Sequence, residues 1–231
     1  MAYSVVSVTS ERFPEFRQNL ADYYLCSSEK AKMRCMLLDI HFPKSVVIAS
    51  HLLSRSMDCF KKFFAIEDID DMRNGLLLFR PLEYHFDHYN LSFVPYNDGT
   101  VRLKVFNKEI LDRFLVDDLT VEQQATLFGG PLPKDWKNTS FPVYAPGSSF
   151  NILTKYGDLD GKELVFLNFE RPFNRCLTFQ AKLAKEQAIA NGWIAEGDDE
   201  FEEVWSNEVP ETIKHVRVDA FLKNRDWSFK K

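Results

Sequence analysis

The sequence has no cysteine pair in a CxxC arrangement, and its 4 cysteines are dispersed along 231 residues. It also lacks an apolar run of the roughly 20 residues that a membrane helix needs. Its first residues lack the basic and apolar segments of a secretory signal. These absences argue against a disulfide framework, a membrane protein and an exported one. We therefore expect an intracellular protein, in the cytoplasm or the nucleus, with reduced cysteines.

Excess positive charge is also missing, because the formal net charge is −5 at pH 7. Nucleic-acid binding requires a basic footprint, so the overall charge argues against binding over the whole surface. The charge is uneven, however, since residues 28–64 contain seven basic residues and three acidic ones. We therefore expect a basic patch on an otherwise acidic protein.

A hydrophobic content of 45%, with 21 phenylalanines, is sufficient for a packed, aromatic-rich core. Apolar residues at spacings of three and four predict helices over 10–25 and 171–191. Pro81 suits the first turn of a third helix that ends near Tyr89. Thr120 and Gln123 form the pattern of a capping box at the start of a fourth helix, ending at Phe128. A further short helix is expected over 57–64.

Short apolar runs between turn residues predict strands and three hairpins. Residues 34–38 are expected to pair with 45–53, and residues 91–96 with 100–106 around Asn97-Asp98-Gly99. A third hairpin is expected within 151–169. Together with the helices, these strands predict an α+β fold.

Four polar residues supply the kinds of groups that phosphodiester cleavage requires. His51 stands at the end of a strand, and a neutral imidazole can take a proton from water. Asn74 precedes a glycine, and its carboxamide can orient a histidine ring. Glu83 and Asp87 are four residues apart on the expected helix, so both carboxylates lie on one face. Their oxygen atoms are ligands that favour Mg²⁺ or Mn²⁺. His85 lies roughly 200° from Glu83 around the helix, so we expect it to pack elsewhere.

The segments Ala49-Ser50-His51-Leu52, Asn74-Gly75-Leu76-Leu77-Leu78 and Phe86-Asp87 resemble the HNH domain of the His-Me finger nucleases, most closely its eukaryotic branch in fungi, oomycetes and other protists. Gly157–Lys162 and Arg171–Phe173 resemble the C-terminal region of that branch. The resemblance implies a ββα-metal core with an additional C-terminal hairpin and long helix. It implies that His51 is the general base, that Asn74 orients it, and that Glu83 and Asp87 lie on the metal side.

The expected function is therefore metal-dependent endonuclease activity on nucleic acid, with DNA as the expected substrate. Phosphate contacts are expected from five basic residues: Arg55, Lys61, Lys62, Arg73 and Arg80. The family often has a histidine where this chain has Glu83, and a ligand where it has Ser50. The alternative is consequently an HNH-fold interaction module without nuclease activity. We expect an N-terminal helix over 1–29, the HNH-type core over 30–115 and an accessory region over 116–231.

Overall fold

The computed structural model describes residues 14–28, 31–57, 64–138 and 151–195. The predicted short helix over 57–64, and the basic residues Lys61 and Lys62, therefore lie wholly or mostly outside the described residues. The described chain combines helices with three two-stranded antiparallel sheets, so the α+β prediction is confirmed. Within the described residues, no helix is both long enough and apolar enough to cross a bilayer.

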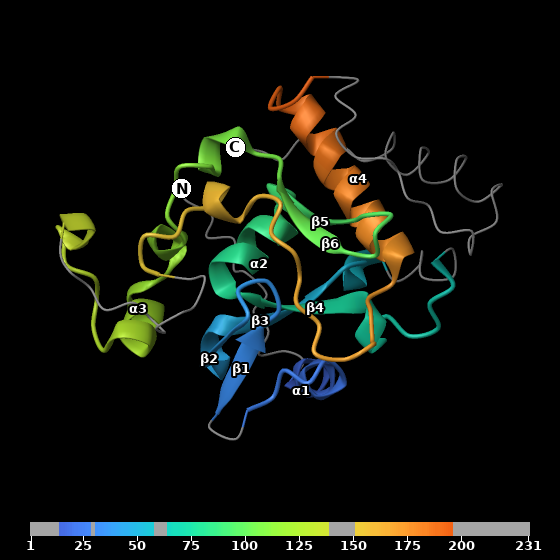
Figure 1. Ribbon diagram of the computed structural model, residues 1–231, viewed down its shortest axis with the longest axis horizontal. Helices are drawn as coiled ribbons and strands as arrows, with labels where there is room; N and C mark the ends of the chain where they lie inside the picture. The colour runs from blue at the N-terminus through green and yellow to red at the C-terminus, as the bar shows by residue number, and fades with distance from the viewer. Residues whose placement is uncertain (1–13, 29–30, 58–63, 139–150, 196–231) are drawn as a thin grey trace.

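The longer helices and the strands follow one another in a simple order (Figure 1). The α-helices are α1 (Pro14–Tyr23), α2 (Arg80–Asp87), α3 (Val121–Phe128) and α4 (Asn174–Ala190). The strands are β1 (Lys32–Cys35), β2 (Ile40–Pro43), β3 (Val47–His51), β4 (Gly75–Phe79), β5 (Leu91–Pro95) and β6 (Val101–Val105). Short 3₁₀ turns connect several of these elements, among them Met72–Asn74 and Leu115–Asp118.

The predicted pairing of residues 34–38 with 45–53 is wrong. β1 pairs with β2, and Cys35 lies opposite Ile40. A tight turn makes this possible, because Asp39 adopts a left-handed backbone with φ of 57° and its N–H donates to the Cys35 carbonyl. β3 is consequently free to pair with β4, and His51 lies opposite Gly75. Two of the three sheets thus join different strands from those expected.

The predicted hairpin within 151–169 is also not formed. Its described residues contain a 3₁₀ turn at Gly157–Leu159 and only isolated bridges, including Arg102 with Glu163. The segment instead follows β6, where the Leu103 N–H donates to the Lys162 carbonyl at 2.8 Å. Its backbone groups are therefore satisfied by a strand far away in the sequence.

Other local predictions are confirmed. β5 and β6 form the expected hairpin around Gly99, whose φ is 81°. Pro81 lies in the first turn of α2, and both hydrogen bonds of the Thr120–Gln123 capping box are formed.

One hydrophobic cluster joins residues from α1, the three hairpins, α2 and α4. α1 and α2 both pack against the β3–β4 hairpin, and α4 packs along β5 (Figure 1). On α2, Leu82 and Phe86 face this core and are almost completely buried. The core thereby fixes β3, β4 and α2 relative to one another. The three-part division of the chain stays a prediction.

Candidate active site

His51 lies at the end of β3, with its ring stacked on Phe16 of α1. The two ring centroids are 4.1 Å apart and the ring planes differ by 8°. The opposite residue, Gly75, leaves room for this stack, because a Cβ there would lie 2.7 Å from Phe16 Cζ. The side chain of His51 is 13% exposed, so the ring is mostly covered but still open to solvent. The tertiary structure therefore holds the imidazole in one plane.

Asp70 fixes the protonation pattern of the His51 ring. Nε2 of His51 is 2.8 Å from Oδ1 of Asp70, and Arg55 pairs with the other oxygen of the same carboxylate. Because a carboxylate only accepts hydrogen bonds, Nε2 carries the proton in the neutral ring. The described part of the chain supplies no hydrogen-bond partner for Nδ1. Its lone pair is therefore available to a ligand.

Burial lowers the pKa of His51 below its ordinary value of 6.5, although the hydrogen bond and charge of Asp70 act in the opposite direction. A lowered pKa means that the ring is neutral at pH 7. A neutral ring with a free nitrogen has the properties of a general base.

The predicted hydrogen bond from Asn74 to His51 is not formed. Asn74 is completely buried, and its amide oxygen accepts from the Leu53 N–H at 2.9 Å. Its amide nitrogen donates to the carbonyls of Leu53, at 3.0 Å, and Ile69, at 2.8 Å. Asn74 therefore ties the chain that follows β3 to the chain that precedes β4. It supports the positions of Arg55 and Asp70 through the backbone, while Asp70 itself contacts the ring.

Asp70 is the residue that the sequence analysis missed. It belongs to an acidic loop, residues 68–71, that leads into β4, and its pairing with His51 spans 19 positions. The only signal in the sequence was a group of carboxylates shortly before Asn74. Nothing local distinguishes Asp70 from Asp68, whose carboxylate accepts from the Asp70 N–H at 3.0 Å.

Glu83 and Asp87 lie one turn apart on α2, as predicted. Glu83 is 16% exposed and Asp87 lies at the surface. Burial, the charge of Asp87 and a hydrogen bond to its carboxyl raise the pKa of Glu83 to about 8. Arg80 Nε lies 4.0 Å from the Glu83 carboxylate and opposes this shift only in part. The pair therefore retains a proton at neutral pH. A bound cation could take the place of that proton.

The donor set of this pair is compatible with a hydrated Mg²⁺ ion, which often binds proteins through one or two carboxylates and keeps several waters. In the described residues, no group of three or more histidine, cysteine, aspartate or glutamate side chains is arranged to hold a metal. Ser50, which precedes His51, contributes no ligand: it is buried, and its Oγ has no partner among the described residues. The geometry thus allows a two-carboxylate site with water completing the shell.

The three described basic residues predicted to contact phosphates each lie near a carboxylate. Arg55 pairs with Asp70, and Arg80 approaches Glu83. Arg73 pairs with Asp71 at 2.9 Å and lies over the ring of Phe173 at 4.2 Å. Their positive charge is therefore partly compensated locally, which weakens the expected basic patch.

His85 points away from the carboxylate pair, as the helical spacing predicted. Its Nε2 lies 3.1 Å from Oδ2 of Asp118, and its Nδ1 lies 2.9 Å from the amide nitrogen of Asn90. Both ring nitrogens are thus occupied, so His85 is not available as a base.

Residues 35–94 match the family model described as HNH endonuclease. The matched segment covers about a quarter of the 231 residues and includes His51, Asn74, Glu83 and Asp87. No curated protein and no solved structure matches the chain. The match supports the HNH family for this segment and indicates a nuclease-type or nucleic-acid-binding function.

Proposed function

We propose that this protein is an HNH-type endonuclease that hydrolyses phosphodiester bonds in DNA with the help of Mg²⁺ or Mn²⁺. The observation that carries the proposal is the His51 ring, held by Asp70 with Nδ1 left free, within the segment that matches the HNH family. The proposal is also supported by the order of three elements, two antiparallel strands, β3 and β4, followed directly by the helix α2.

In this mechanism, Nδ1 of His51 takes a proton from a water molecule while the water oxygen attacks phosphorus and the bond to the leaving sugar oxygen breaks. Asp70 stabilises the imidazolium that forms, as a carboxylate paired with the opposite ring nitrogen does. Arg55 pairs with the other carboxylate oxygen of Asp70. Glu83 and Asp87 would hold the metal ion, which supplies positive charge for the phosphate oxygens when it is bound.

The second candidate is a module that keeps the HNH fold and binds partners without cleaving nucleic acid. Two observations favour it. The described residues offer no third acidic, histidine or cysteine ligand beside Glu83 and Asp87. In addition, Arg55 and Arg73, two of the residues expected to contact phosphates, pair with carboxylates. The two candidates share a fold and differ in catalysis.

A plasmid-nicking assay separates these candidates. Supercoiled DNA is incubated with the protein in Mg²⁺, in Mn²⁺ or in EDTA, and an RNA transcript is tested in parallel. We expect metal-dependent nicking by the wild type and a loss of about 100-fold or more in His51→Ala, as for removal of a general base. The control is His41→Ala, because His41 is an exposed residue of β2.

Equal nicking by wild type and His51→Ala would exclude His51 as the base. Absence of nicking by the wild type in every metal would favour the non-catalytic module. Cleavage of RNA but not of DNA would be consistent with the proposed mechanism and would show that the substrate is RNA.

A further inference from the structure

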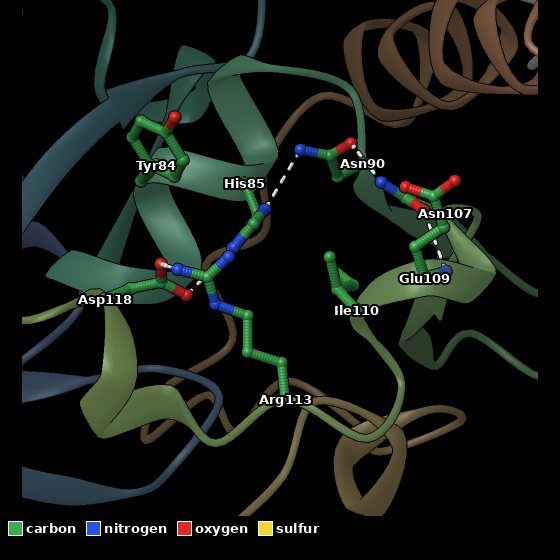
Figure 2. Close-up of a pocket in the computed structure, with 8 residues that line it drawn as sticks. All are labelled: Tyr84, His85, Asn90, Asn107, Glu109, Ile110, Arg113 and Asp118. Atoms are coloured by element: carbon green, nitrogen blue, oxygen red, sulfur yellow. Dashed lines mark hydrogen bonds and ion pairs between the residues drawn. The ribbon is translucent and has the colours of Figure 1, made fainter.

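A second polar site lies on the flank of α2 that faces away from Glu83. It is a cavity of about 380 Å³, near the lower end of the 300–1,000 Å³ that small-ligand pockets span. Eight residues line it (Figure 2). The buried or half-buried residues are His85, Asn90, Asn107, Ile110 and Asp118. The exposed residues are Tyr84, Glu109 and Arg113.

The wall is a continuous hydrogen-bonded network, drawn as dashed lines in Figure 2. The Asn107 amide donates to the Asn90 amide oxygen at 3.0 Å, and the Asn90 amide donates to His85 Nδ1 at 2.9 Å. His85 then donates to Asp118, which also accepts from Tyr156 and pairs with Arg113. Each group fixes the next, so the wall is preorganised for a ligand.

The groups that this network leaves unused define the ligand. Each of the amides of Asn90 and Asn107 has two N–H donors, and one of the two donates to a side chain among the described residues. The Glu109 carboxylate has no partner among the described residues. The charge of Arg113 is compensated by Asp118. An anionic ligand is therefore disfavoured, and the ligand must offer N–H donors to Glu109 and an acceptor to the amides.

We propose that this pocket binds a guanine-type base. Guanine places two adjacent N–H donors beside a carbonyl oxygen, which matches a carboxylate next to amide donors. Its flat ring also suits a pocket with an aromatic and an apolar side chain, Tyr84 and Ile110. Adenine has no carbonyl oxygen and offers only its single amino group to Glu109, so it forms fewer of these bonds.

The proposal rests on the proposed function insofar as the base belongs to the substrate strand. The pocket and the carboxylate pair lie on different flanks of α2, and a helix diameter of about 10–12 Å is spanned by about three stacked nucleotides at about 3.4 Å each. An unpaired guanine near the cleavage position could therefore occupy the pocket. A free guanine nucleoside has the same chemistry and is the second possible source.

Isothermal titration calorimetry on the full chain tests the pocket without requiring cleavage. The probes are guanosine, inosine, which lacks the 2-amino group, and adenosine, followed by octathymidylates with one central dG, dI or dA. We expect guanine to bind at least tenfold more tightly than inosine and adenine in one or both sets, since a hydrogen bond to a charged group contributes about that much. If only guanosine binds, the pocket is a site for a free nucleoside. If only the strand with dG binds, the pocket is a site for a base of a nucleic-acid strand.

Glu109→Gln should remove the preference for guanine, because an amide offers one acceptor where the carboxylate offers two. Glu186→Gln is the matched control, since Glu186 is exposed on α4 away from the pocket. Thermal melting verifies that both variants fold. Equal affinity for guanine and adenine, or an unchanged preference in folded Glu109→Gln, would overturn the proposal. Guanine binding without plasmid cleavage would reject only the nuclease function, and cleavage without a guanine preference would reject only the pocket.

Discussion

Two histidines of this protein, His51 and His85, each bond through Nε2 to an aspartate, yet they differ in the other ring nitrogen. Nδ1 of His85 is occupied by the Asn90 amide, and the ring is buried within a network. Nδ1 of His51 has no described partner, and its ring is 13% exposed. An aspartate partner is therefore common to a structural histidine and to a candidate base. The unoccupied nitrogen is the feature that distinguishes them.

Of the changes that test this comparison, removing the aspartate of the candidate base should have the largest effect on activity, although a smaller one than removing His51 itself. In Asp70→Asn we expect cleavage to fall about 10–100-fold, as for other residues that orient a functional side chain. The hydrogen bond and charge of Asp70 raise the pKa of His51, so their loss should lower that pKa further. The acidic limb of the pH–rate profile, where His51 becomes protonated, should then move to lower pH. Asp112→Asn is the control, because Asp112 is 94% exposed and its ion pair is with Lys155, not with the candidate site. An unmoved limb would show that Asp70 has no direct effect on the ring.

A second prediction concerns the stability of the carboxylate pair on the other flank of α2. The folded protein holds the proton of Glu83 up to about pH 8, whereas the unfolded chain releases it near 4.5. Between these values the native state binds more protons, so stability is present below pH 4.5 and is lost as pH rises to 8. The expected loss is on the order of 3–4 kcal/mol from pH 5 to pH 8, since a difference of one pKa unit corresponds to about 1.4 kcal/mol.

Urea denaturation at several pH values measures this loss. Glu83→Gln should flatten the pH dependence, and Mg²⁺ should stabilise the wild type at pH 8 but not the variant. Glu186→Gln, on the exposed face of α4, should behave like the wild type. Stability that stays constant from pH 5 to pH 8 would mean that folding does not raise the pKa of Glu83.

The smallest expected effect, a change in stability, comes from replacing His85, whose two ring nitrogens both have hydrogen-bond partners. His85→Ala removes a buried partner from both Asp118 and Asn90, which should cost about 1–3 kcal/mol of unfolding free energy. Urea denaturation at pH 7 measures it, with the exposed neighbour His88→Ala as the control. His51→Ala should cost less, because one ring nitrogen of His51 has no described partner. A greater loss in His51→Ala than in His85→Ala would reverse the assignment of structural and functional histidines.

Local chemistry explains which elements were predictable. The capping box at Thr120, the proline in the first turn of α2 and the Gly99 turn each act through a few neighbouring residues, and each is present in the structure. The hairpin of residues 34–38 with 45–53 failed because a left-handed turn at Asp39 allowed β1 to pair closer in the sequence. The apolar pattern of one strand does not show which of two similarly apolar segments will pair with it.

The sequence by itself determined which residues could act: a histidine at a strand end, and two carboxylates one helical turn apart. The tertiary structure alone decided what each would contact. Asp70, the partner of His51, lies 19 residues away. Two of the partners of Asp118, His85 and Tyr156, lie 33 and 38 residues away. Helix and strand periods are set by the backbone within a few residues, whereas such contacts depend on how the core packs distant segments together.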